Sequence, residues 1–225
     1  MDGFLFRAEW FYTIRMRFAL LPIVLAAVSL AGCNVVVTAT PLLTLADEAG
    51  GAPLRPGVWR LDAGPSCVVD EARPIPEWPA CAGGVVFDVG VATWFDHDAT
   101  PPGWTHQAYV LAAGTPRIGQ TAVNVGGDIH LNARPFVYAG VRATRTDPQG
   151  RVLAIELWPV QCGPPPLADA THEMATRRPL PGMIMNPGDP VCTTRETSYL
   201  RAAARASEAW TEKTMAAHWV RDGDR

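Results

Sequence analysis

The chain has 225 residues, a formal net charge of -3, and 48% hydrophobic against 18% charged residues. This length suits one domain plus a targeting segment, and the apolar content excludes intrinsic disorder. The mildly acidic balance, with no cluster of Lys and Arg, argues against a nucleic-acid partner, because phosphate binding requires a concentrated positive field.

The N-terminal region has the pattern of a signal peptide. Arg15 and Arg17 precede the uncharged run "FALLPIVLAAVSLAG", residues 18–32. The run is shorter than the ~20 apolar residues of a transmembrane helix, and Pro22 interrupts it. Residues 1–32 are therefore predicted to be an N-terminal extension and a signal peptide. Whether translation starts at Met1 or Met16 stays open.

The end of this run, Leu30-Ala31-Gly32-Cys33, resembles the lipobox of bacterial lipoproteins. The resemblance implies cleavage after Gly32, a diacylglyceryl group on the Cys33 thiol and often a further acyl chain, such as palmitate, on the new amino group. Two or more acyl chains anchor a protein stably to a membrane. The alternative is an ordinary signal peptide with a leftover cysteine.

The lipoprotein resemblance also predicts where in the cell the protein is located. It places the protein in the cell envelope, lipid-anchored on the periplasmic side, with the membrane as a partner through Cys33. Asn34 stands where Asp favours retention in the inner membrane in some bacteria, so the outer membrane is favoured. The choice between inner and outer membrane stays open.

Residues 33–56 are predicted to be the lipidated cysteine and a tether, because Gly50-Gly51 and Pro53 break any helix. Residues 57–225 are predicted to form a single β-rich domain, since short apolar runs alternate with turn residues. The clearest unit is a hairpin from Pro135 to Cys162. Its turn, Asp147-Pro148-Gln149-Gly150, has Pro at the second position and Gly at the fourth.

One long helix is expected over about 194–215, starting at a capping box formed by Thr193 and Glu196. Its buried face is predicted from helical spacing to comprise Tyr199, Ala203, Ala206 and Trp210. The predicted fold class is mainly β or α+β, with an antiparallel sheet or partly closed barrel and one C-terminal helix.

Four cysteines remain after Cys33, namely Cys67, Cys81, Cys162 and Cys192. In an oxidising envelope compartment they suggest two disulfides, for which three pairings exist and the sequential one is the simplest. None of them forms the tight C-x2-C pair that is typical of a metal site.

The most polar stretch, residues 94–109, contains Asp96, His97, Asp98 and His106. Two imidazoles and a carboxylate could bind a metal ion, but Asp-His-Asp is equally typical of a surface turn between strands. No nucleophile elbow, phosphate-binding loop or dinucleotide fingerprint occurs. The sequence therefore names no catalytic residue and no cofactor, and it favours a non-catalytic protein.

Gly57-Val58-Trp59 resembles the G-x-W on the first strand of lipocalins. The resemblance implies that Trp59 packs across the closed end of an eight-stranded barrel whose lumen holds an apolar ligand. Alternatively, Trp59 is an ordinary core residue of a generic β-rich domain.

The sequence thus supports a membrane-anchored envelope lipoprotein that acts as a structural or binding module. One alternative is a lipocalin-like carrier of a small apolar ligand, with Trp59 at the pocket. Another is a metal-dependent envelope enzyme using the Asp96 to His106 group. A third is a scaffold that contacts an envelope protein through its Pro-rich loop, residues 164–190.

Overall fold

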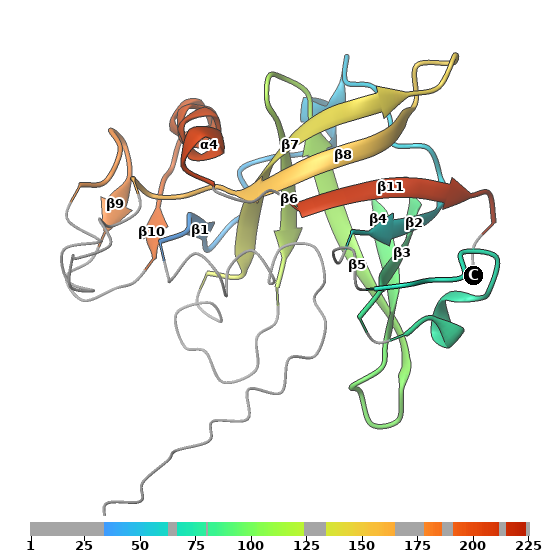
Figure 1. Ribbon diagram of the computed structural model, residues 1–225. Coiled ribbons are helices and arrows are strands. Elements are labelled where there is room, and N and C mark those ends of the chain that lie inside the picture. Colours follow the sequence, from blue (N-terminus) through green and yellow to red (C-terminus); the bar gives the residue numbers. More distant parts are fainter. Residues whose placement is uncertain are drawn as a thin grey trace, which may run out of the picture.

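The computed structural model describes residues 34–62, 67–79, 81–123, 134–164, 178–185, 191–211 and 215–223 (Figure 1). The strands are β1 (Val37–Thr38), β2 (Gly57–Leu61), β3 (Gly83–Asp88), β4 (Val91–Asp96), β5 (Gly103–Ala112), β6 (Arg117–Ala122), β7 (Phe136–Thr146), β8 (Val152–Pro159), β9 (Ile184–Met185), β10 (Cys192–Thr193) and β11 (Met215–Arg221). The helices are α4 (Thr197–Trp210) and two 3-10 turns, η1 (Leu45–Glu48) and η2 (Ile75–Glu77). No helix in these ranges is long and apolar enough to cross a bilayer.

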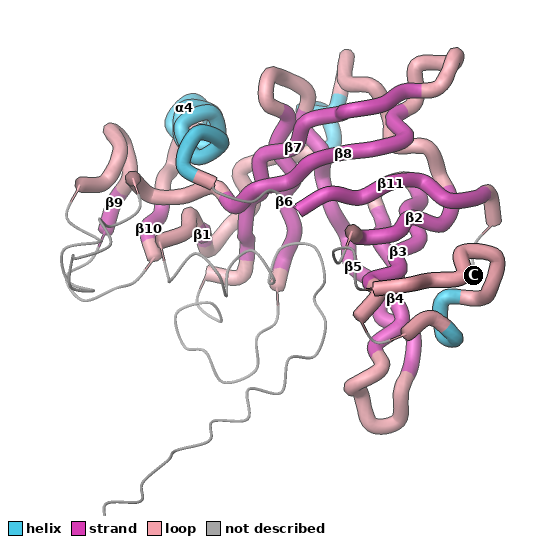
Figure 2. Tube along the Cα trace, in the orientation of Figure 1, coloured by secondary structure: helices cyan, strands magenta, loops and turns pink. Residues whose placement is uncertain are grey.

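Eight strands close into an antiparallel barrel in the order β2-β3-β4-β5-β6-β7-β8-β11 (Figure 2). Closure comes from β11, which pairs with β2 on one side and with β8 on the other. The short strand β1 pairs with β7, and β9 with β10 forms a separate small sheet. The predicted mainly β fold with a C-terminal helix is confirmed, and the barrel is fully closed.

The hairpin of β7 and β8 forms as predicted, with Val141 opposite Leu157. At its turn the Asp147 carbonyl oxygen accepts the Gly150 N–H at 2.9 Å, and Gly150 has the positive φ of 76° that favours glycine. The Asp147 carboxylate accepts the N–H groups of Gln149 and Arg151. Burial alone would raise the pKa of Asp147, but these hydrogen bonds and the Arg151 guanidinium lower it.

The strand order gives the barrel two unlike ends. Successive connections between antiparallel strands alternate between the two ends of the barrel. The tight connections β3–β4, β5–β6 and β7–β8 are every second one, so they all lie at the same end. We call this the hairpin end. The longer connections, including 96–103 and the one that carries α4, leave from the opposite, loop end.

Residues 34–56 pack on the domain, in line with the apolar run from Leu42 to Ala46, which is suited to docking. Val35, Val36 and Val37 are at most 3% exposed, because β1 pairs with β7 and its side chains enter the core beneath α4. Further along, Gln120 of β6 holds this segment through both ends of its carboxamide. Its oxygen accepts the N–H groups of Leu42 and Leu43 at 2.8 Å each, and its nitrogen donates to the Leu43 carbonyl at 2.9 Å.

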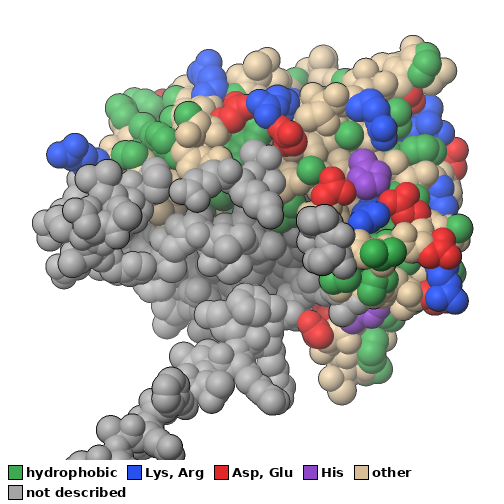
Figure 3. All heavy atoms as spheres, in the orientation of Figure 1, with side chains coloured by type: hydrophobic (Ala, Val, Ile, Leu, Met, Phe, Trp, Pro, Cys, Tyr) green, Lys and Arg blue, Asp and Glu red, His purple; other side chains and the backbone are tan. Residues whose placement is uncertain are grey.

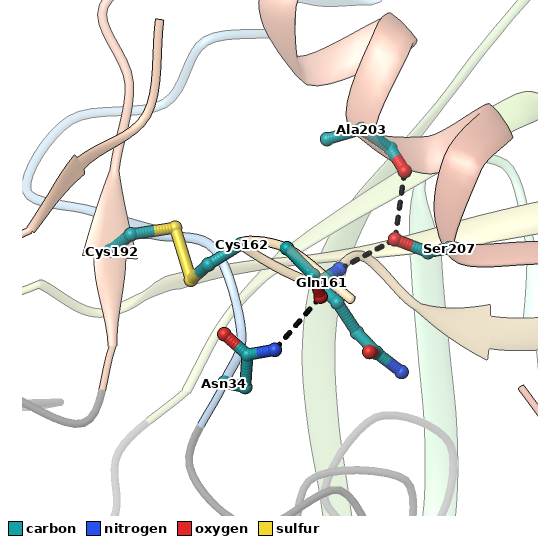
Figure 4. Close-up of a disulfide and its surroundings, with 7 residues drawn as sticks. Asn34, Gln161, Cys162, Cys192, Ala203 and Ser207 are labelled. Carbon is teal, nitrogen blue, oxygen red and sulfur yellow. Dashed lines mark hydrogen bonds between the residues drawn. A yellow bond between two sulfur atoms is a disulfide. The ribbon is translucent and has the colours of Figure 1, made fainter. Parts of the chain in front are cut away.

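The helix α4 is shorter than expected, and its predicted buried face is confirmed at Ala203 but is wrong at Tyr199. The buried residues are Leu200, Ala203, Ala204 and Ser207, whereas Tyr199 is 37% exposed. In an alanine-rich helix apolar spacing discriminates poorly, and Ser207 is buried because its hydroxyl donates to the Ala203 carbonyl and accepts the Gln161 N–H (Figure 4). The expected capping box is absent, since Thr193 lies in β10.

The two disulfides join Cys67 to Cys81 and Cys162 to Cys192, the sequential pairing. The first fastens a loop that covers the outer face of β2 and β3, where Ile75 and Trp78 are buried. The second joins the chain after β8 to β10 and is buried in the core cluster that also contains Val36 and Leu200. Each constrains a long loop in the unfolded chain, worth about 3 kcal/mol by the chain-entropy estimate.

Replacing the buried Gln120 tests how residues 41–44 are held. Gln120→Ala leaves two N–H groups and one carbonyl without their partner, so the free energy of unfolding should fall by about 3 kcal/mol in urea denaturation. Gln107→Ala, on the neighbouring strand, is the matched control and should change it by less than about 0.5 kcal/mol. Equal losses for both variants would show that the carboxamide does not hold the segment.

Candidate ligand-binding lumen

The inner wall of the barrel is apolar because alternate residues of each strand face the lumen. The buried side chains there form one cluster that includes Phe87, Leu111, Val141, Ile155 and Leu157. They do not fill the space, and a cavity of about 90 Å³ remains. It is lined by Leu54, Phe87, Ala92, Trp94, Gln107, Tyr109, Leu111, Gly119, Gln120, Thr121, Ala139, Val141, Ile155 and Leu157.

The cavity wall carries few polar groups. Thr121 donates its hydroxyl to the Ala108 carbonyl, and the Tyr109 hydroxyl donates to the Asp88 carbonyl at 3.0 Å. Among these described lining residues there is no carboxylate, imidazole, amine or guanidinium. Because an unpaired charge is strongly disfavoured in such surroundings, the lumen suits an uncharged group.

Trp59, the residue expected at the pocket, lies inside the barrel but does not line the cavity. It is fully buried, packs edge-on against Phe87 with ring centroids 5.6 Å apart, and donates its indole N–H to the Arg55 carbonyl at 2.9 Å. Phe87 in turn packs edge-on against Tyr109. Trp59 therefore supports the ring that lines the cavity, near the hairpin end.

A second cavity of about 80 Å³ adjoins the first at the hairpin end. Leu54, Phe87, Tyr109 and Leu111 line both. Unlike the first, the second also meets charged side chains, those of Glu48, Asp88 and Arg117. The hairpin end thus carries an apolar chamber with a polar one beside it.

The side chains around the second cavity are engaged with the backbone. Arg117 donates to the carbonyls of Leu111 and Ala52, and Glu48 accepts the Leu111 N–H at 2.8 Å. The Arg117 Nε is buried without a hydrogen-bond partner in the described structure. Burial lowers the pKa of Arg117, while the charge of Glu48 acts in the opposite sense.

Leu54 lines both cavities and belongs to a strap of the chain that crosses the hairpin end. The strap, residues 52–55, runs beside the start of β8. There the Arg55 N–H donates to the Val152 carbonyl and the Val152 N–H to the Pro53 carbonyl. The Arg55 guanidinium lies 3.6 Å above the Trp219 ring and pairs with Asp222. These contacts hold Leu54 against the lumen.

The residues considered for a metal site do not converge. The Asp96 carboxylate accepts the N–H groups of Asp98 and Ala99, which makes it part of a turn. His97 packs on Phe95, and the His106 Nδ1 contacts the Thr93 hydroxyl at 2.9 Å. Since Thr93 and Asp96 are three residues apart on β4, about 10 Å of strand separates His106 from the turn.

The described residues contain no group of three His, Cys, Asp or Glu side chains placed to hold a metal ion.

Another polar cluster, on the outer face of β2 and β11, serves a structural purpose. Glu71 accepts from Arg60 at 3.0 Å and contacts His218 at 3.3 Å, and His218 also contacts Asp62. Burial would raise the pKa of Glu71, but the bonds from Arg60 and His218 lower it, so this ion-pair group fastens the first disulfide loop.

The remaining sequence-based expectations fall partly outside the described residues. Cys33 and most of the Pro-rich loop, 165–177 and 186–190, lie there. The chain matches no family model, and comparison with curated proteins and with solved structures gives no match either. The barrel has the shape of a lipocalin, and the likeness rests on shape and on Gly57-Val58-Trp59 alone.

The sequence did not identify the residues that line the lumen. Only the resemblance to lipocalins at Gly57-Val58-Trp59 suggested that a lumen exists. Alternation in β7 and β8 indicates which side chains share a face, and it identifies Val141, Ile155 and Leu157 as apolar. It does not reveal that the face closes on itself. Leu54 was missed because it belongs to the segment expected to be a tether.

The phenol of Tyr109 reports the polarity of the lumen. Burial, helped by the charge of Glu48, raises its pKa to about 12. An absorbance titration of phenolate at 295 nm, taken as wild type minus Tyr109→Phe, should therefore have its midpoint near pH 12. Since the unfolded pKa is about 10, the stability linked to Tyr109 is present below pH 10 and lost as pH rises from 10 to 12.

A difference titration centred near pH 10 would contradict a buried phenol. Tyr199→Phe is the control, because Tyr199 is more than a third exposed on α4 and its removal leaves the lumen unchanged.

Proposed function

We propose that this protein is a membrane-anchored envelope lipoprotein whose barrel binds a small, uncharged, apolar ligand in the lumen. The observation that carries the binding part is the cavity of about 90 Å³ with its apolar wall. Side chains in a core devoted only to stability pack to a density that leaves few voids larger than a water molecule. An apolar space inside a closed barrel is typical of a ligand site.

The size of the cavity limits the ligand. An engineered apolar cavity of about 150 Å³ is known to bind benzene, so the lumen as it stands accepts a smaller group such as a few methylenes. A longer ligand would extend past Leu54 into the second cavity, where Glu48, Asp88 and Arg117 could meet a polar end. The favoured ligand is therefore a slender apolar molecule or a chain with one polar end.

Filling the lumen tests the binding proposal. A Cβ placed on Gly119 would lie 3.6 Å from the nearest atom, a Val141 methyl. The larger side chain of Gly119→Val should therefore fill part of the cavity without a backbone clash. Short n-alkanols should raise the Tm of the wild type, since a ligand that binds only the folded state stabilises it. The increase should vanish in Gly119→Val.

Ala108→Val provides the matched control, because Ala108 is exposed and faces outward on the neighbouring strand β5. This variant should keep the ligand-induced increase in Tm. No increase in the wild type, or the same increase in Gly119→Val, would refute binding in the lumen.

The anchoring part of the proposal rests on Leu30-Ala31-Gly32-Cys33 and on the two disulfides, which are consistent with an extracytoplasmic protein. Intact mass of the protein from its native membrane should correspond to a chain starting at Cys33 plus acyl chains. Alkylation should add nothing, because the other four cysteines are paired. Cys33→Ser should lose the acyl mass, and a full-length or unlipidated wild type would refute the anchor.

A further inference from the structure

The segment that follows Cys33 is fixed in the folded domain from its first described residue. Asn34 is only 3% exposed, and its side-chain amide donates to the Gly163 carbonyl at 2.9 Å (Figure 4). Its own carbonyl accepts the Cys162 N–H at 2.9 Å. Asn34 is thus held by two hydrogen bonds to the chain that leaves β8.

The next two residues are held from both sides. The Val35 carbonyl accepts the Cys192 N–H at 3.2 Å, and the Val36 N–H donates to the Val160 carbonyl at 2.9 Å. The disulfide between Cys162 and Cys192 joins the two flanking segments covalently. Residues 34–36 therefore lie between two cross-linked segments and cannot act as a flexible leash.

We infer that the barrel lies directly against the membrane surface, with the side formed by Asn34, β9 and β10 facing the lipid and the β7–β8 turn pointing away. This inference rests on the proposed lipidation of Cys33. Consecutive Cα atoms are about 3.8 Å apart, so acyl chains on Cys33 would begin next to the fixed Asn34. The bilayer surface is then the partner that this side must contact. We call it the anchor side.

The exposed side chains of the anchor side fit a lipid surface. Ile184 of β9 is 47% exposed and lies opposite Thr193 of β10. Nearby in the chain Arg178 and Arg195 are exposed, as is Glu196 beside Arg195. Figure 3 shows hydrophobic side chains gathered around α4, on the same side of the molecule. Apolar side chains with arginines suit the interface of an anionic membrane.

The opposite pole is well defined. β1 pairs with the first residues of β7, where Val37 lies opposite Val137. From there β7 runs to the turn at Asp147, a strand length of about 30 Å. Ile184, in contrast, lies about two strand spacings, or 10 Å, from Val36, because Cys192 bridges to Val36 and pairs with Met185. Figure 1 shows this separation, with β1, β9 and β10 on one side and the β7–β8 turn on the other.

The experiment places a fluorescent amino acid at Ile184 or at Gln149, both exposed, in the full lipidated protein. Each variant is reconstituted into vesicles of phosphatidylethanolamine and phosphatidylglycerol that contain a lipid with a nitroxide on its headgroup. Because the two positions differ so much in height, quenching at Ile184 should exceed that at Gln149 by at least about threefold. Equal quenching at both positions would overturn the inference.

A leash variant provides the matched control. Ten Gly and Ser residues inserted between Cys33 and Asn34 span about 17 Å on average and release the barrel from the surface. Quenching at Ile184 should fall towards that at Gln149, and an unchanged value would overturn the inference. Intact mass of the same samples separates the two proposals. Missing acyl chains refute the anchor itself, whereas acylated protein with equal quenching refutes only the fixed orientation.

Discussion

The pairing of β11 with both β2 and β8 is the constraint on which the rest of the structure depends. Ala217 lies opposite Leu61 on one side and Ile155 on the other, and it is 1% exposed. Without β11 the sheet would end in two open edges, and the apolar faces of β2 and β8 would meet water. Closure turns one curved sheet into a wall with an inside and an outside.

The inside and outside of that wall are stabilised differently. Inside, Trp59, Phe87 and Tyr109 pack edge to face and leave the lumen partly open. Outside, the wall is covered by α4 and β1 on one side and by the first disulfide loop on the other. Because these outer layers carry the disulfides, the chain is stapled without any covalent link crossing the lumen. Neither disulfide therefore obstructs the lumen.

Local features were predictable from sequence, and long-range ones were not. The β7–β8 hairpin was predicted because alternation and the turn at Asp147–Gly150 act within a few residues. Closure was not, since β2 and β11 are more than 150 residues apart and nothing in either strand specifies the other. The contacts that hold residues 42–43 were not predictable for the same reason, because Gln120, which binds Leu42 and Leu43, is remote in sequence. The Asp96 to His106 group shows that a local concentration of polar residues does not by itself predict a metal site. The Asp96 carboxylate accepts hydrogen bonds within its own turn instead.

The most direct test of an apolar lumen is diffraction from crystals of the protein pressurised with xenon, which enters dry apolar cavities. The structure predicts a xenon peak inside the barrel, between the side chains of Phe87, Tyr109 and Val141. A lumen occupied by ordered water, with no xenon peak, would contradict both the apolar lumen and the function proposed for it.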